Sequence, residues 1–309
     1  MLRRSLLFLF AALLTGALHA SALATTVFPP GFPVGLEPAP GLSVSSHFPG
    51  FEDVDRHVQV AITSLPPAAY EKMRGTLTKG QPAGHGPHEE SFRFTSGSGF
   101  LVSGTIEDKG VAVHRWFLMA PPTDKPARPA VLIRVEVPDA ARATYTDAAV
   151  RKMLASVTFR KVPTSELLGL LPFKLTDLAG FRVAKIVPGT VVVTDGPTDD
   201  LTHQPYAIVF VGRGAPADKD RARFARDILT TAPVLNLAVT SSEPMRIKSL
   251  PGYEIRAKAE GRKGQPLKVV QWVRFGTAGF LGVIGVTPDK DWDTVFNRFR
   301  ALRDGVDGR

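Results

Sequence analysis

Residues 92–106 read FRFTSGSGFLVSGTI, and residues 245–259 read MRIKSLPGYEIRAKA. In the first stretch, two short segments with alternating apolar residues flank the turn residues 96–99 (SGSG), which predicts two antiparallel strands joined by a tight turn. The two stretches align without a gap, and the matched residues are Arg93 with Arg246, Ser96 with Ser249, Gly99 with Gly252, Phe100 with Tyr253 and Val102 with Ile255. Each half of the chain is therefore predicted to contain the same hairpin.

Further blocks match between the halves in the same order. They are Pro33, Leu36, Gly41, Leu42 and Val44 with Pro172, Leu175, Gly180, Phe181 and Val183, then Trp116 with Trp272, and finally residues 137–139 (VPD) with 287–289 (TPD). Ordered self-similarity of this kind indicates a tandem duplication. The boundary is predicted near residues 161–166, which gives a first domain of residues 25–161 and a second of residues 162–309.

Period-two segments and amphipathic segments follow one another in each half. Strands are predicted at 57–62, 92–94, 100–106, 111–119 and 130–137, and in the second half at 206–211, 245–247, 253–259, 267–275 and 280–286. Helices are predicted at 68–77, 146–157, 218–231 and 291–302. Two amphipathic helices can cover the apolar surface of one sheet. The expected fold is therefore α+β, with two tandem sandwich domains, each a mainly antiparallel sheet flanked by two helices.

The matched residues are mostly proline, glycine, tryptophan and apolar residues. Trp116 and Trp272 are predicted to anchor the two cores by burying a large apolar area. Asp139 and Asp289 follow a proline ahead of each closing helix, so they are predicted to cap those helices. No histidine or glutamate is matched between the halves. What was duplicated is therefore the architecture. A functional site present in only one half is the alternative that this leaves.

The order of elements in each half resembles that of the Mog1/PsbP-like superfamily, which includes secreted bacterial proteins of the DcrB and LpqN type. The resemblance rests on the early Pro-Gly-Leu segment, the antiparallel strands and the closing helix that follows Pro-Asp. It implies a sandwich fold and an accessory or binding role without catalysis. It carries no functional residue over to this chain, because no site motif of the family is found.

The first 24 residues read MLRRSLLFLFAALLTGALHASALA. Arg3 and Arg4 precede an apolar run, and Ala22-Leu23-Ala24 offers small residues for cleavage, with Ala20-Ser21-Ala22 as a second option. This is the pattern of a secretory signal peptide. The alternative is a membrane anchor, but the run is shorter than the about 17–25 residues that a spanning helix needs. A periplasmic or secreted protein is expected.

Composition excludes several classes of protein. The chain has no cysteine, which excludes a disulfide scaffold, a thiolate metal site and a cysteine nucleophile. It contains neither a phosphate-binding loop of the G-x-x-x-x-G-K-[ST] type nor a G-x-G-x-x-G segment that opens a helix. No cofactor is therefore expected.

The strongest candidate for a metal site is the segment that contains His85, His88, Glu89 and Glu90. Imidazole and carboxylate groups together can bind zinc or a harder cation. The segment GQPAGHGPHEE is also typical of a polar loop between a helix and a strand, and this structural interpretation is favoured.

A second candidate is Asp199, Asp200 and His203, whose side chains could serve acid–base chemistry or hold a cation. Pro197 and Pro205 bracket these residues, so a turn is the favoured interpretation.

A basic group lies in the second half, where most of the net charge of +9 is found. Its members are Arg256, Lys258, Arg262, Lys263 and Lys268, around a hairpin tip predicted at 261–264. Such a surface can attract an anion such as a lipid headgroup or a glycan. Nucleic acid is not expected, because no aromatic residues are interleaved for stacking. An ordinary solvated surface is the alternative.

The sequence thus favours a non-catalytic, exported binding or accessory protein of the bacterial envelope. Its partner would be an unknown protein or an anionic envelope component. One alternative is a metal-dependent or hydrolytic periplasmic enzyme that uses the His85/His88 segment or the Asp199/His203 segment. A carrier of a small ligand, held between sheet and helix, is a further possibility.

Overall fold

The computed structural model of the protein describes residues 25–77, 88–108, 110–121, 129–199, 201–214 and 216–308. The chain divides into two compact units, residues 1–160 and 161–309. The predicted leader, residues 1–24, lies outside the described residues. Within the described ranges, no helix has the length and the hydropathy that crossing a membrane requires.

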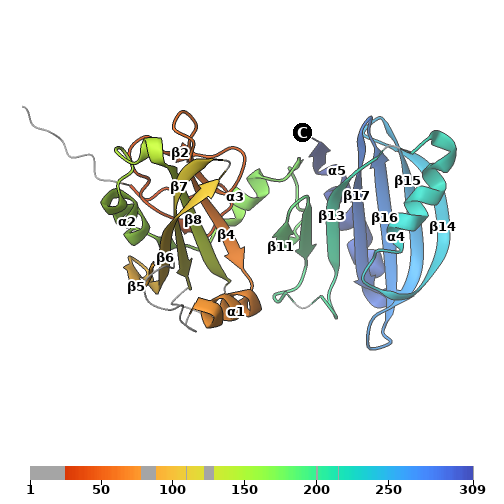
Figure 1. The fold of residues 1–309 in the computed structure, drawn as a ribbon. Helices are drawn as coiled ribbons and strands as arrows, with labels where there is room; N and C mark the ends of the chain where they lie inside the picture. The colour runs from red at the N-terminus through yellow and green to blue at the C-terminus, as the bar shows by residue number, and fades with distance from the viewer. Residues whose placement is uncertain are drawn as a thin grey trace, which may run out of the picture. The chain divides into compact units, whose positions relative to one another are not determined.

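The first unit is built on a seven-stranded sheet in which all neighbouring strands are antiparallel (Figure 1). In spatial order the strands are β2 (Ser43–Val44), β3 (Gly50–Asp53), β4 (Val58–Leu65), β8 (Ala130–Pro138), β7 (Val111–Ala120), β6 (Gly97–Asp108) and β5 (His88–Phe94). Two short strands, β1 (Val34–Gly35) and β9 (Thr158–Phe159), form a separate antiparallel pair. The hairpin predicted at residues 92–106 is confirmed as β5, a turn and β6.

Two helices cover opposite faces of this sheet. α1 (Pro67–Leu77) follows β4, and α2 (Asp147–Ala155) follows β8 after the short 3-10 helix η1 (Asp139–Ala141). Because side chains alternate along β7, Leu118 belongs to the main core with α2, whereas Met119 belongs to a smaller cluster with α1.

The second unit repeats this topology. Its sheet runs β11 (Arg182–Val187), β12 (Thr190–Thr194), β13 (Tyr206–Arg213), β17 (Gly279–Pro288), β16 (Pro266–Phe275), β15 (Leu250–Glu260) and β14 (Leu235–Ile247). The short pair is β10 (Phe173–Leu175) with β18 (Val306–Gly308). The helical segments are α3 (Thr164–Gly169), η2 (Asp218–Asp220), α4 (Arg221–Leu229), η3 (Asp289–Asp291) and α5 (Trp292–Asp304).

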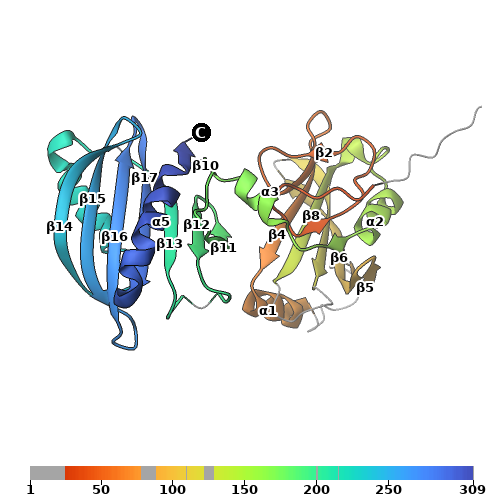
Figure 2. The ribbon, with the colours of Figure 1, turned by 180° about the vertical axis from the view of Figure 1, so that it is seen from behind.

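In this unit too the helices lie on opposite faces. Figure 1 shows α4 in front of the sheet, and Figure 2, seen from behind, shows α5 in front of it. Along β16, Trp272 packs in the cluster with α5, and Val273 packs in the cluster with α4. The predicted fold class, two α+β sandwiches in tandem, is confirmed by the shared strand order of the two sheets.

The strand pairings test the internal repeat residue by residue. Val113 pairs with Pro138 in the first unit, and Leu267 pairs with Pro288 in the second. Pro138 and Pro288 are matched residues of the repeat, and so are Phe100 and Tyr253. Phe100 pairs with Met119 and Tyr253 with Val273, so the neighbouring hairpins give the same residue-to-residue correspondence, or frame, between the two units. Val113 and Leu267 are therefore equivalent positions.

This frame corrects the predicted match between the tryptophans. Trp116 corresponds to Val270, and Trp272 lies two residues further along its strand. A shift of two residues keeps a side chain on the same face of a sheet, so both tryptophans still face a core. They are 5% and 1% exposed, as expected for core anchors.

Asp139 and Asp289 do not cap helices, so that prediction is wrong. The residues at the N-cap positions of η1 and η3 are prolines, with no side-chain hydrogen bond. Instead Asp139 lies 3.4 Å from Nε2 of His114, and Asp289 lies 3.1 Å from Nζ of Lys268. His114 and Lys268 are equivalent in the frame above, so each aspartate ties the same strand position to the turn that follows the sheet.

A buried contact links the early segment of the first unit to its sheet and to the turn before α2. The Tyr145 hydroxyl donates to Oδ2 of Asp53 at 2.7 Å, and both residues are buried. Gly41 has a φ of +97°, and a Cβ there would lie 2.5 Å from the Tyr145 hydroxyl oxygen. Glycine at this position thus supplies both the backbone conformation and the space. We call this contact the carboxylate clasp.

The second unit has its own carboxylate clasp. Arg298 of α5 donates two hydrogen bonds to Asp195, at 2.7 and 2.9 Å, and its guanidinium lies 4.4 Å from the ring centre of Phe181. Gly180, with a φ of +77°, leaves room for this guanidinium. The matched glycines Gly41 and Gly180 therefore serve the same structural role.

The second clasp predicts an acid-dependent stability. The hydrogen bonds from Arg298 lower the pKa of Asp195 below its usual value. A carboxyl group whose pKa is lower in the folded state stabilises the fold above its unfolded pKa of about 3.9, and this contribution is lost as the pH falls through the folded pKa. Asp195→Asn should therefore lower the urea midpoint of the second unit at pH 7, and it should flatten the loss of stability below pH about 4.

The measurement is urea unfolding followed by circular dichroism between pH 7 and pH 2. Asp227→Asn, at an exposed position of α4, is the matched control. Parallel pH profiles for wild type and Asp195→Asn would contradict the role given to the clasp.

Candidate functional site

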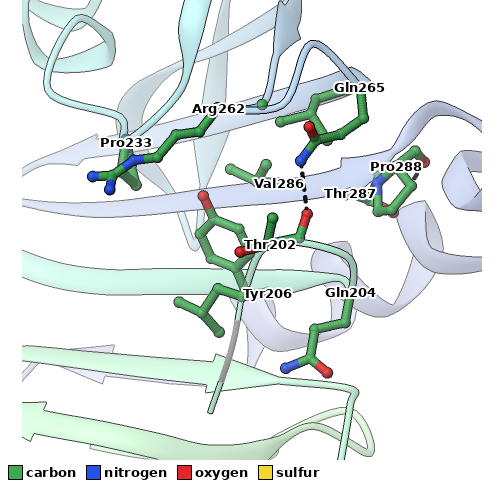
Figure 3. A pocket seen from close by; sticks show the side chains of 12 residues that line it. Thr202, Gln204, Tyr206, Pro233, Arg262, Gln265, Val286, Thr287 and Pro288 are labelled. Atoms are coloured by element: carbon green, nitrogen blue, oxygen red, sulfur yellow. Dashed lines mark hydrogen bonds between the residues drawn. The ribbon is translucent and has the colours of Figure 1, made fainter. Parts of the chain in front are cut away.

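A hollow of about 210 Å³ lies at one end of the sheet of the second unit. It forms where β13 and β16 begin and β17 ends, beneath the loop at residues 201–205 and the hairpin tip at residues 261–265 (Figure 3). The lining residues are Leu201, Thr202, Gln204, Tyr206, Pro233, Gly261, Arg262, Gln265, Leu267, Val286, Thr287 and Pro288. We call it the β13–β17 pocket.

Tyr206 supplies a hydroxyl that faces the pocket (Figure 3). The residue is 5% exposed, and in Figure 3 its hydroxyl points toward Arg262 and Pro233. Burial raises the pKa of Tyr206 to about 12, so the phenol stays protonated and neutral around pH 7. Within the residues that the structure describes, no hydrogen bond to this hydroxyl is found, and its oxygen is open to the hollow. The pocket therefore holds an unused donor.

Arg262 supplies the positive charge of the pocket. It lies at the exposed tip of the hairpin between β15 and β16, and in Figure 3 its side chain points toward Pro233. No ion pair of Arg262 is found in the described part of the chain. Since an arginine offers several donors in a planar fork, this side chain can take a planar anion in two hydrogen bonds.

Gln265 joins the two loops that form the walls. Its Nε2 donates to the carbonyl oxygen of Thr202 at 2.9 Å, and its Oε1 accepts from the backbone N–H of Lys263 at 3.1 Å. A Cβ on Gly261 would lie 2.1 Å from Nε2 of Gln265, so glycine at position 261 leaves space for this bridge. The hairpin tip is therefore held over the pocket.

The remaining walls are mainly apolar, from Leu201, Pro233, Leu267, Val286 and Pro288. Thr287 is fully buried, and its hydroxyl contacts the carbonyl oxygen of Pro288 at 3.3 Å. Among the described residues that line the pocket there is no histidine, aspartate or glutamate. The arrangement offers donors and apolar surface, which suits binding.

The equivalent place in the first unit has different chemistry. Tyr206 pairs with Val286 across β13 and β17, whereas Gln59 pairs with Glu136 across β4 and β8. Glu136 lies 2.6 Å from Nε of Arg115 in an ion pair. The tyrosine donor is thus present in the second unit and absent at the equivalent position of the first, Gln59. A site in one half alone was the alternative that the sequence left.

The structure places only part of the predicted metal segment. His85 lies outside the described residues, and His88 and Glu89 are described only as backbone at the start of β5. Glu90 forms an ion pair with Arg151 of α2. No group of three or more metal-ligating side chains occurs among the residues described, and a site on His85 and His88 stays a prediction.

The second predicted group is also only partly described. Asp199 forms an ion pair with Arg182 at 2.8 Å, and Asp200 lies outside the described residues. His203 is exposed in a loop between the bend at 195–199 and β13. The structure therefore brings a basic partner to Asp199.

The five predicted anion-binding residues separate into different environments. Arg256 is paired with Glu254 at 2.7 Å and lies 4.6 Å from the ring centre of Phe296. Lys268 is paired with Asp289 and lies over the ring of Trp292 at 5.5 Å. Lys258 and Lys263 are exposed, and Arg262 lines the β13–β17 pocket.

Sequence reasoning missed Tyr206, Gln204 and Gln265. They come from segments far apart in the chain, and only Arg262 carried a signal, as part of a basic group. The cross-strand pairs Tyr206 with Val286 and Leu267 with Pro288 bring the segments together. The strand register is the information from which these residues could have been predicted to lie together.

Comparisons with known proteins give likenesses of fold. No family model matches the chain, and no curated protein matches it. It is structurally similar to LpqN of Mycobacterium tuberculosis, a protein involved in cell envelope biogenesis (12% identity, 44% of this chain and 82% of that chain, TM-score 0.35). It is also similar to CyanoP, the PsbP of the cyanobacterium Synechocystis sp. PCC 6803 (14% identity, 45% and 87%, TM-score 0.34).

A third likeness extends over both units. The type VI secretion immunity protein TplEi of Pseudomonas aeruginosa covers 92% of this chain and 96% of its own, at 12% identity and a TM-score of 0.29. Within the chain itself, the two sheets share one strand order, which agrees with a tandem duplication.

Proposed function

We propose that the protein is an exported, non-catalytic binding protein of the bacterial envelope, and that the β13–β17 pocket is its ligand site. The observation that carries the proposal is the Tyr206 hydroxyl, which has no hydrogen-bond partner among the described residues and points into a hollow that Arg262 also lines (Figure 3). A concave site with apolar walls and a few convergent polar groups is typical of small-molecule binding.

The chemistry of the pocket supports binding over catalysis. General acid–base chemistry needs a group whose pKa lies near the working pH. Tyr206, with a pKa of about 12, and an arginine are both far from that range at pH 7. They can bind and orient a ligand, and they exchange no proton with it under these conditions.

Export is supported by the leader, in which two arginines precede an apolar run and a small-residue cleavage site. Cleavage after Ala24 would give a mature protein that begins at Thr25. The accessory role implied by the resemblance fits the same compartment.

Native mass spectrometry of the protein recovered from a periplasmic extract tests the proposal. We expect a mass that begins at Thr25, together with a small-molecule adduct that gentle activation removes. Pro233→Trp places a bulky ring at the rim of the pocket and should abolish the adduct, whereas Pro163→Trp, at an exposed position outside the pocket, should retain it. An adduct equally abundant in both variants would remove the pocket from the proposal, and a full-length chain confined to the cytoplasm would remove export.

A further inference from the structure

We infer that the β13–β17 pocket recognises a small carboxylate, with Arg262 and the Tyr206 hydroxyl as its two donors and the apolar wall as the seat for the rest of the molecule. This inference rests on the proposed function, and it adds the chemical class of the ligand.

The charge of the pocket favours an anionic ligand. Arg262 is the one charged side chain among the described residues that line the pocket, and the described part of the chain offers it no ion pair. A cationic ligand would meet repulsion and no carboxylate, and a neutral ligand would leave the guanidinium unused. A carboxylate accepts two parallel hydrogen bonds from such a fork.

The hydroxyl of Tyr206, the second donor of the pocket, also favours a carboxylate. A phenol that stays protonated donates one hydrogen bond, and a carboxylate oxygen has lone pairs free to accept it in addition to the bonds from arginine. The Tyr206 oxygen is not among the buried atoms that lack a partner, so this hydroxyl is open to the hollow and a ligand acceptor can reach it.

Size and wall chemistry limit the rest of the ligand. An apolar cavity of about 150 Å³ holds benzene, so a hollow of about 210 Å³ suits a ring or short chain that carries one carboxyl group. Leu201, Leu267 and Val286 give this body an apolar surface. A phosphate dianion would have one arginine for two charges and would place its other oxygens against apolar carbon.

The test uses benzoate, benzyl alcohol, benzylamine and inorganic phosphate as probes, with the full mature chain at constant ionic strength. Dissociation constants are measured by calorimetry or by ligand-observed NMR. We expect benzoate to bind at least tenfold more tightly than the other three probes. Equal binding of benzoate and benzyl alcohol, preferential binding of phosphate or benzylamine, or binding of none of the four would overturn the inference.

Variants assign the donors. Arg262→Gln should weaken benzoate binding at least tenfold, and Tyr206→Phe, which removes one oxygen atom, should weaken it about threefold to tenfold. Lys263→Gln is the matched control, because Lys263 is the adjacent exposed cation on the same hairpin tip and does not line the pocket; less than a twofold change is expected. Equal effects of Arg262→Gln and Lys263→Gln would reduce the recognition to general charge attraction and overturn the inference.

The results for Pro233→Trp and for benzoate, taken together, distinguish a failure of this inference from a failure of the proposed function. If Pro233→Trp removes the native adduct while benzoate shows no preference, the pocket binds a ligand and the carboxylate assignment fails. If Pro233→Trp changes neither the adduct nor benzoate binding, both fail. A tripeptide with a free C-terminal carboxyl, compared with its amide, tells a chain terminus from a free acid as the source of the carboxylate.

Discussion

Gly99→Ala should lower the free energy of unfolding of the first unit by about 3 kcal/mol or more, because the added methyl group has no space. A Cβ at position 99 would lie 2.0 Å from the carbonyl oxygen of Met119 and 3.0 Å from its carbonyl carbon. These are backbone atoms of the facing strand β7, so a rotamer change cannot relieve the overlap. The strands β6 and β7 would have to move apart and lose part of their hydrogen-bonded register.

The matched control for this change lies in the same unit. Gly75 is in α1, and a Cβ there meets nothing within 4 Å. Gly75→Ala should therefore be neutral or stabilising, by up to about 1 kcal/mol, since alanine favours the helix. Urea unfolding followed by circular dichroism compares the two variants. A midpoint for Gly99→Ala as high as that of wild type would show that the sheet tolerates the extra carbon.

The second large effect is expected from Trp272→Ala, which should cost the second unit about 3–5 kcal/mol, the usual range for removal of a buried large aromatic side chain. Trp272 is 1% exposed, and it contacts Phe296 and the guanidinium of Arg303. Its indole N–H also donates to Glu254 at 2.7 Å, so truncation removes a hydrogen bond together with the apolar contacts.

Trp292→Ala is the matched control for this prediction. Trp292, at the start of α5, contacts Phe296 as Trp272 of β16 does, but Trp292 is only partly buried. Its cost should be clearly smaller than that of Trp272→Ala. Circular dichroism is the suitable probe, because both variants change the fluorescence. Equal losses of stability would mean that burial of Trp272 does not dominate the core.

Much of the fold could be predicted from the sequence because the repeat and the strand alternation are local signals. The hairpin at residues 92–106 carries both a turn composition and matched residues in the other half. Strands β11 and β12 were not predicted. They join the sheet through pairings that a local pattern does not show, β11 with β12 and β12 with β13. β14 begins at Leu235, well before the predicted residue 245, since an edge strand with many exposed residues shows little alternation.

The site was harder to predict than the fold, and the reason is physical. Tyr206 reads in the sequence as one more apolar position of a strand, and its burial and its missing partner appear only when β13 lies beside β17. The basic group was visible, yet paired and unpaired cations look alike in a sequence. Only the structure separates Arg256, which Glu254 holds, from Arg262, which lies at the pocket.

The carboxylate clasps indicate how the two copies diverged. Asp53 is held by a phenol and Asp195 by a guanidinium, while a glycine with positive φ stands beside each contact. The acid and the glycine were kept, and the group on the helical side was exchanged. A sequence profile meant to detect distant members of this lineage should therefore weight the glycine and the aspartate heavily and leave the partner position free.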